Sequence, residues 1–258
     1  MKNNRDVYDN FVHEYTGYEL TVPEQIILQQ LKNNWHKIRM LDIGVGTGRT
    51  SYTFSSLVKE YIGIDYSSPM LERCKEMIGE HESVKFEVMD ARDLSKFYDQ
   101  PFDFVMFSLN GIDSVCHEDR QKILSEIYKV TAKNGMFKFS THSLHAFPFK
   151  VKFPEFKISK PIRSIYRWLK PLRRAFRLWW HYRGVDVSEI KNKPWAVLAT
   201  GDHNFEIQIY HVKPDYQLKE LEKIGFEVVS AYDKYGIERD LMTDTSGNYM
   251  NILCKPKG

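Results

Sequence analysis

The sequence has 258 residues, of which 42% are hydrophobic and 28% charged, and its formal net charge is +3. This composition is that of a globular protein and excludes disordered and fibrous chains. The chain shows no apolar signal region, no apolar run near the ~18–20 residues that span a bilayer, and no paired or metal-like cysteine spacing, so we expect a cytoplasmic protein.

Strands and helices alternate along the first half of the chain. Apolar runs predict strands, and apolar residues at steps of three and four predict helices. The predicted strands cover 38–44, 61–66, 83–90, 102–110 and 135–143, and the predicted helices cover 49–58, 68–80 and 117–131. This order predicts a doubly wound α/β fold, with a mostly parallel sheet between two layers of helices.

The alternation stops near residue 143. A stretch rich in aromatic, basic and proline residues follows, and then two alternating runs around a Gly-Asp-His-Asn turn predict a hairpin. A helix and two strands complete the pattern after residue 214. We therefore expect a core formed by 1–142 and 214–258, interrupted by an inserted cap or lid over 143–213.

The turn after the first predicted strand is dense in glycine. Asp42 precedes Gly44, Gly46 and Gly48, which occupy every second position. Dinucleotide-binding domains use G-x-G-x-x-G, but Arg49 stands where the third glycine of that motif belongs. This spacing disfavours a NAD-dependent dehydrogenase.

The G-x-G-x-G turn with its preceding acid resembles motif I of the class I S-adenosylmethionine (SAM) dependent methyltransferases. The resemblance is good over about the first 140 residues and looser at the C-terminus. It implies a Rossmann-like, seven-stranded sheet, SAM as cofactor and S-adenosylhomocysteine as product. It also implies that Asp42 helps to receive the ammonium group of SAM.

Further residues follow the resemblance, at the ends of the next strands. Asp65 is expected to accept the ribose hydroxyls, and Asp90 to accept the adenine amino group beside the amide of Ala91 or Arg92. Tyr66 and Met70 would enclose the adenine, although Met70 fits a core helix position equally well. The remaining cofactor candidates are Ser108 and Asn110, which end the fourth strand, and Tyr8 and Tyr15, which lie in a lid helix or pack on a helix face.

The sequence indicates less about the molecule that accepts the methyl group. Several histidines are expected near the mouth of the site, namely His117, His142, His145, His203 and His211. His142 ends the fifth strand and is the candidate general base, against a structural strand-end role, and Tyr210 is a candidate substrate contact that could also simply pack. No pair of histidines has metal-like helical spacing with a carboxylate, so we expect no metal. The loop after the fourth strand lacks the motifs of DNA-base methyltransferases, which makes a nucleic-acid partner unlikely and favours a small-molecule substrate.

The inserted stretch is strongly basic. Between Phe147 and Pro194 there are 13 Lys or Arg and 3 Asp or Glu. The segment 159–183 has an apolar stripe that includes Leu172, Phe176 and Trp179, opposite a basic side. We expect a cap helix whose stripe covers the active site. The alternatives are peripheral attachment to an anionic membrane and a surface for an acidic substrate or RNA.

The sequence thus predicts a methyltransferase that acts on an oxygen or nitrogen of a small molecule. One alternative is a SAM-using enzyme that cyclises its substrate or transfers another arm of the sulfonium. Another is a membrane-associated methyltransferase or binding module for a lipid-like partner.

Overall fold

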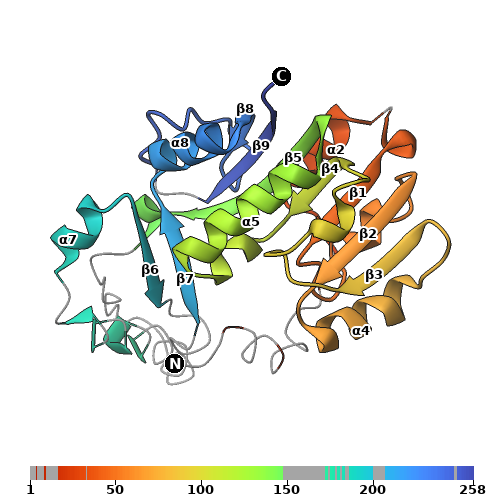
Figure 1. The fold of residues 1–258 in the computed structure, drawn as a ribbon. Coiled ribbons are helices and arrows are strands. Elements are labelled where there is room, and N and C mark those ends of the chain that lie inside the picture. The colour runs from red at the N-terminus through yellow and green to blue at the C-terminus, as the bar shows by residue number, and fades with distance from the viewer. Residues whose placement is uncertain are drawn as a thin grey trace, which may run out of the picture.

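The computed structural model describes residues 4, 9, 17–32, 34–147, 172–173, 175–177, 179–180, 182–183, 186–199, 207–246 and 249–258. Its central feature is a nine-stranded sheet with helices on both faces (Figure 1). The strands are β1 (Arg39–Ile43), β2 (Glu60–Asp65), β3 (Val84–Val88), β4 (Phe102–Phe107), β5 (Thr131–Ser143), β6 (Trp195–Ala199), β7 (Gln208–Val212), β8 (Phe226–Tyr232) and β9 (Met250–Pro256). The α-helices are α2 (Val22–Gln30), α3 (Ser51–Phe54), α4 (Ser68–Ile78), α5 (His117–Val130), α7 (Val187–Asn192) and α8 (Pro214–Ile224).

The strands follow the order β3-β2-β1-β4-β5-β7-β6, and β9 pairs with both β5 and β8. The ladders from β3 to β7 are parallel, whereas β5–β9, β8–β9 and β6–β7 are antiparallel. The predicted α/β fold is therefore confirmed. The sheet has nine strands where seven were expected, because the predicted hairpin joins it: β5 pairs with β9 along 137–141 and then with β7 at 142–143.

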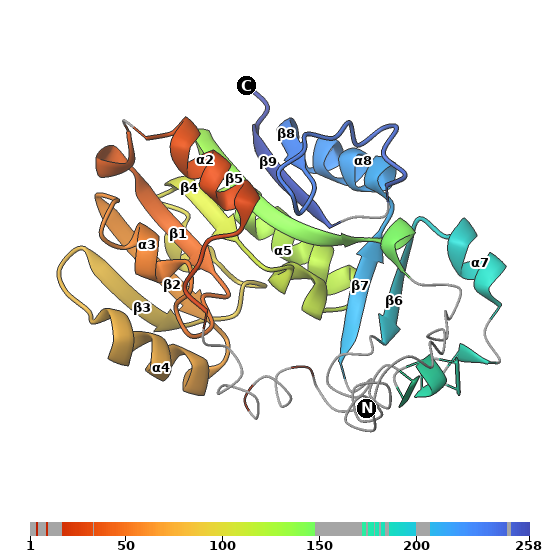
Figure 2. The same cartoon turned by 180° about the vertical axis from the view of Figure 1, so that it is seen from behind.

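Two hydrophobic cores lie on opposite faces of the sheet. Leu41 and Ile43 of β1 pack in the core with α5, while Met40 packs in the core with α2, α3 and α4. Figure 1 has α5 and α8 toward the viewer, and Figure 2, seen from behind, has α2 and α3 in front. Successive side chains of a strand point to opposite faces, so this alternation also fixes the side to which Asp42 points.

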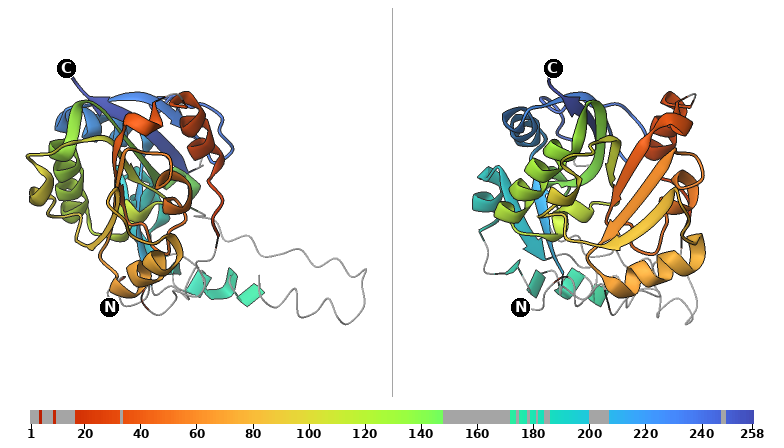
Figure 3. Two further views of the ribbon diagram at one scale, coloured as in Figure 1. Left: turned by 90° about the vertical axis from the view of Figure 1, so that its right-hand side faces the viewer. Right: turned by 45° about the vertical axis from the view of Figure 1, so that its right-hand side comes forward.

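Two residues of the stripe predicted to be buried in the inserted segment are exposed, and Leu172 is half-buried. Residues 172–173, 175–177, 179–180 and 182 have helical backbone. Phe176 and Trp179 are 52% and 44% exposed, so the prediction that they pack against the sheet domain is wrong. Figure 3 shows this helical segment, in aquamarine, at the edge of the molecule. No described helix is long and apolar enough to cross a membrane.

Candidate active site

A cavity of about 390 Å³ opens where the carboxyl ends of β1, β2 and β4 meet. The strand order reverses between β1 and β4, and such switch points are where open α/β sheets bind ligands. The turns after β1, β2, β3 and β4 supply the walls. They comprise Gly17, Ile43, Gly44, Val45, Gly46, Thr47, Arg49, Ile64, Asp65, Tyr66, Ser67, Met70, Met89, Ala91, Phe107, Ser108, Leu109, Gly111 and Ser114.

The three glycines of the turn after β1 have different reasons to lack a side chain. Gly44, Gly46 and Gly48 all have positive φ, of +67°, +56° and +96° respectively. A Cβ on Gly44 would lie 2.8 Å from the Phe107 ring, and one on Gly48 would lie 2.9 Å from Cys74 Sγ of α4. A Cβ on Gly46 meets no protein atom within 4 Å. Because Gly46 lines the cavity, the free space beside it allows a ligand to approach the backbone.

Asp65 at the end of β2 is the acid of the cavity wall. Its Oδ2 accepts the N–H of Gly46 and its Oδ1 accepts the N–H of Ser67, both at 2.8 Å. Burial raises the pKa of this carboxyl, and these two hydrogen bonds oppose the rise. Each carboxylate oxygen has a second lone pair, so Asp65 keeps acceptor capacity toward the cavity.

Arg49 is the only cation among the described lining residues. Its guanidinium makes two hydrogen bonds to Glu24 of α2, at 2.7 and 2.9 Å, and a third to Ser108 Oγ at 2.8 Å. Lys138 Nζ lies 3.2 Å from Glu24, and both side chains are fully buried. Burial alone would raise the pKa of Glu24, but Lys138 and Arg49 outweigh it and hold this pKa well below its usual range. The cluster fixes α2 beside the cavity.

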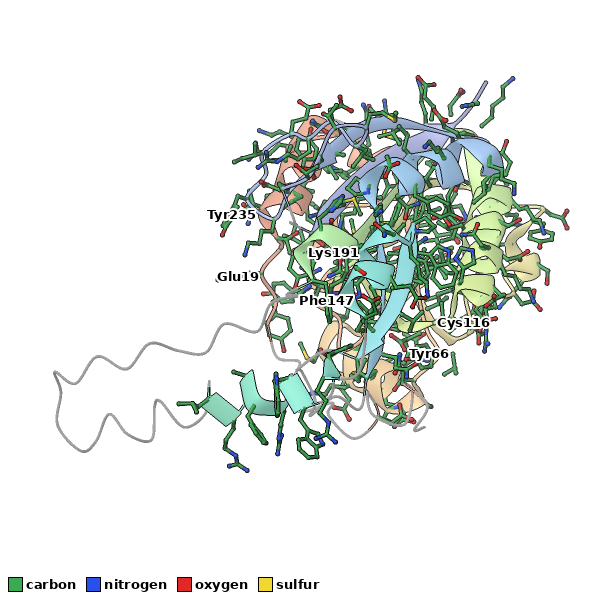
Figure 4. The ribbon with its side chains drawn as sticks, turned by 90° about the vertical axis from the view of Figure 1, so that its left-hand side faces the viewer. Glu19, Tyr66, Cys116, Phe147, Lys191 and Tyr235 are labelled. Carbon is green, nitrogen blue, oxygen red and sulfur yellow. The ribbon has the colours of Figure 1, made fainter. Side chains whose placement is uncertain are left out.

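The structure brings several predicted cofactor residues together around the cavity. Figure 4 labels one of them, Tyr66. Those that line it are Gly44, Gly46, Asp65, Tyr66, Met70, Ala91 and Ser108. Tyr8 and Tyr15 lie outside the described residues.

Three predicted cofactor residues are not in the cavity wall. Asp42 points to the α3 side of the sheet, where Thr50 and Tyr61 each donate to its Oδ2 at 2.6 Å and burial raises its pKa to about 6. Asp90 forms an ion pair with Arg92 at 2.6 Å. Asn110 sits in the left-handed region at φ 58°. Strand alternation thus directs Asp42 toward Thr50 and Tyr61, and its predicted contact with the ammonium group of SAM stays a prediction.

His142 ends β5 and is held by a buried carboxylate. Its Nδ1 lies 2.7 Å from Asp113 Oδ2, and its backbone N–H donates to the same oxygen at 2.7 Å. Asp113 also accepts from Thr141 Oγ1 at 2.7 Å and is itself fully buried. With Nδ1 facing the carboxylate, Nε2 is the nitrogen left to exchange a proton. His142 does not line the cavity, but Gly111 and Ser114 of the short helix that holds Asp113 do.

Tyr210 lies away from the cavity. The side chain is fully buried in the core on the α5 side, where it stacks on Trp195 and its hydroxyl lies 2.8 Å from His117 Nδ1. Burial raises the pKa of Tyr210 well above its ordinary range. This position gives Tyr210 and His117 a packing role, and we withdraw Tyr210 as a substrate contact. His145 is exposed, and His203 lies outside the described residues.

Two parts of this site were not predicted from the sequence. In the sequence, Arg49 argues against a dinucleotide motif without indicating its place in the cavity wall, and Glu24 and Lys138 are not among the predicted site residues. Lys138 stands between Phe137 and Phe139 in an otherwise apolar strand. A lysine at such a position must find a buried partner, and this was the available signal.

Comparison with known proteins agrees with this arrangement. Residues 40–135 match the family described as "Methyltransferase domain". The chain is 28% identical to the carboxy-S-adenosyl-L-methionine synthase of Helicobacter pylori (strain P12), over 89% of this chain and 86% of that protein.

Solved structures share the fold. A SAM-dependent methyltransferase from Clostridium acetobutylicum superposes with a TM-score of 0.61 at 14% identity, covering 98% of this chain and 97% of that one. The 1,6-didemethyltoxoflavin-N1-methyltransferase of Burkholderia thailandensis, solved with its substrate and S-adenosylhomocysteine, also gives 0.61 at 14% identity, covering 99% and 88%.

Proposed function

We propose that this chain, which belongs to the class I SAM-dependent methyltransferases and uses SAM as its cofactor, transfers the methyl group to an oxygen or nitrogen of a small molecule. The observation that carries the proposal is the cavity at the carboxyl ends of β1 to β4, with Asp65 in its wall and free space at Gly46.

The charges of the cavity wall fit the parts of SAM. Asp65 keeps lone pairs for the two ribose hydroxyls while Gly46 and Ser67 hold the carboxylate in place. Arg49 provides the cation for the methionine carboxylate. Met70, Met89 and Ala91 offer apolar contacts for adenine. When bound, SAM would supply a methyl group on its sulfonium, with the neutral thioether S-adenosylhomocysteine as the leaving group.

The protein then has to position the acceptor and remove its proton. We propose that His142 Nε2 accepts this proton, because Asp113 faces Nδ1 and fixes the orientation of the ring. Asp113 thereby acts as a positioning residue. This assignment is supported by the short helix Gly111–Ser114, which contributes to the cavity wall on one side and holds Asp113 on the other.

A second candidate is the synthesis of a carboxylated SAM, the activity that the name of the Helicobacter relative gives. Its likeness extends over most of both chains, which favours this reading. A carboxylate added next to the sulfonium calls for a further cation in the site. The described wall offers Arg49 alone, so we rank methyl transfer first.

Calorimetry tests the binding part of the proposal. SAM and S-adenosylhomocysteine should bind, and NAD should not. A decarboxylated S-adenosylhomocysteine should bind about tenfold more weakly or worse, because it lacks the carboxylate that we assign to Arg49. Tighter binding of NAD than of SAM would contradict the proposal, and equal binding of the decarboxylated ligand would remove the role of Arg49.

A further inference from the structure

A cluster of aromatic side chains lies exposed on the helical segment near residue 180. Phe176, Trp179 and Trp180 are 52%, 44% and 53% exposed. Their ring centroids are 5.8, 6.1 and 6.4 Å apart, so they form one continuous apolar patch. Figure 4 shows the side chains of this segment pointing away from the sheet. Exposed patches of this kind mark interaction sites.

The other side of the segment attaches it to the protein. Ala175 is only 7% exposed. The hydroxyl of Tyr182 donates to the carbonyl of Ala199 in β6 at 2.8 Å, and its ring packs against Phe147. The aromatic patch is therefore presented outward by a segment that is anchored on its inner side.

One arginine contacts the patch, and another lies one helical turn before Phe176 in the sequence. Arg173 and Arg183 are exposed, and the Arg183 guanidinium lies 3.4 Å from the centre of the Trp180 ring. The sequence from 172 to 185 contains four arginines and no acidic residue. A partner must therefore offer apolar volume and negative charge at the same place.

We propose that the aromatic–arginine patch, formed by Phe176, Trp179, Trp180, Arg173 and Arg183, binds the surface of an anionic lipid bilayer. Tryptophan and phenylalanine favour the boundary between headgroups and acyl chains, and arginines beside them meet the lipid phosphates. An RNA is a poorer fit, because base stacking needs free ring faces. Here Arg183 covers Trp180, and the rings neighbour one another. The proposal does not depend on the reaction assigned above.

Sedimentation of the full chain with vesicles tests the patch. The vesicles contain phosphatidylcholine alone or mixed with phosphatidylglycerol. We expect at least about tenfold stronger binding to the mixed vesicles, weakening at high salt. Phe176→Ser/Trp179→Ser/Trp180→Ser should lower that binding about tenfold or more, and Arg173→Gln/Arg183→Gln should do the same.

A matched variant controls for the general loss of exposed apolar groups. Tyr235 and Ile237 are 64% and 54% exposed, and Tyr235 lies far from the segment (Figure 4). Tyr235→Ser/Ile237→Ser should bind vesicles like the parent. All variants should keep their S-adenosylhomocysteine affinity, which shows that they fold. Equal binding to both kinds of vesicle, vesicle binding that survives the aromatic variant, or binding of single-stranded RNA without vesicle binding would overturn the proposal.

Discussion

Asp65 at the end of β2 accepts the backbone N–H of Gly46, in the turn after β1, at 2.8 Å. This bond joins the two neighbouring strand ends that form one wall of the cavity. It places the only acid of the described wall beside the glycine whose missing Cβ leaves space for a ligand. Acid and turn thus form one preorganised unit, and each half can be changed by a single substitution.

Replacing Asp65 with Asn should weaken SAM and S-adenosylhomocysteine by about 1.5–3 kcal/mol, since the hydrogen bonds lost are to a charged group. Calorimetry measures the change. Asp233→Asn is the control, because Asp233 is also buried and also accepts two backbone N–H groups, from Tyr235 and Ile237, but pairs with Arg239 and does not line the cavity. Equal loss of affinity in both variants would show that the effect is structural.

Gly46→Ala should lower cofactor affinity about tenfold or more, because the new methyl group occupies ligand space. Gly79→Ala is the control. Gly79 also has positive φ and no atom within 4 Å of its Cβ position, but it ends α4 outside the cavity wall. Both variants should lose roughly 1–3 kcal/mol of folding stability, because alanine is strained at positive φ. Unchanged affinity in Gly46→Ala would place the ligand elsewhere.

His142→Gln should reduce turnover about 10²–10⁴-fold, the usual contribution of a general base. Its S-adenosylhomocysteine affinity should not change. Asp113→Asn should also reduce turnover, because the ring then loses the carboxylate that orients it. His145→Gln, at an exposed position close by, should behave like the parent. Full turnover in His142→Gln would remove this histidine from the mechanism.

His211 should make the folded state sensitive to acid. Burial first, and then the neighbouring His142, lower its pKa from 6.5 to about 4. The unfolded chain therefore binds this proton more readily, and stability falls as the pH falls from 6.5 toward 4. At ~1.36 kcal/mol per unit, the loss is about 3 kcal/mol.

Urea unfolding across that pH range measures how the free energy of unfolding depends on pH in the parent and in His211→Gln. The variant should lack the loss, whereas His36→Gln, at an exposed position, should keep it. The same pH dependence of the free energy of unfolding in the parent and in His211→Gln would show that this histidine does not titrate as its burial requires.

The sequence was most informative where a short motif determines the backbone. The G-x-G-x-G turn, the strand-end Asp65 and the alternation of strands and helices all led to the cavity. It was less informative where the orientation of a side chain decides. Asp42 belongs to the same motif, yet strand alternation points it at Thr50 and Tyr61.

Contacts between segments far apart in the sequence could not be predicted either. Glu24 meets Lys138 across 114 positions of the chain, and no local pattern encodes that pairing. The apolar stripe near residue 176 has the spacing of a buried helix face, but spacing does not say what covers the face. Phe176 and Trp179 have this spacing and are nevertheless exposed.

The central claim is methyl transfer from SAM to a small molecule, and one measurement tests it most directly. The protein is incubated with SAM labelled in its methyl group and a metabolite extract, and the labelled products are identified by mass spectrometry. Methyl transfer predicts that the label enters a small-molecule product while S-adenosylhomocysteine forms in equal amount. Label that stays on a sulfonium carrying an added carboxylate, with no S-adenosylhomocysteine, would contradict methyl transfer and establish the second candidate.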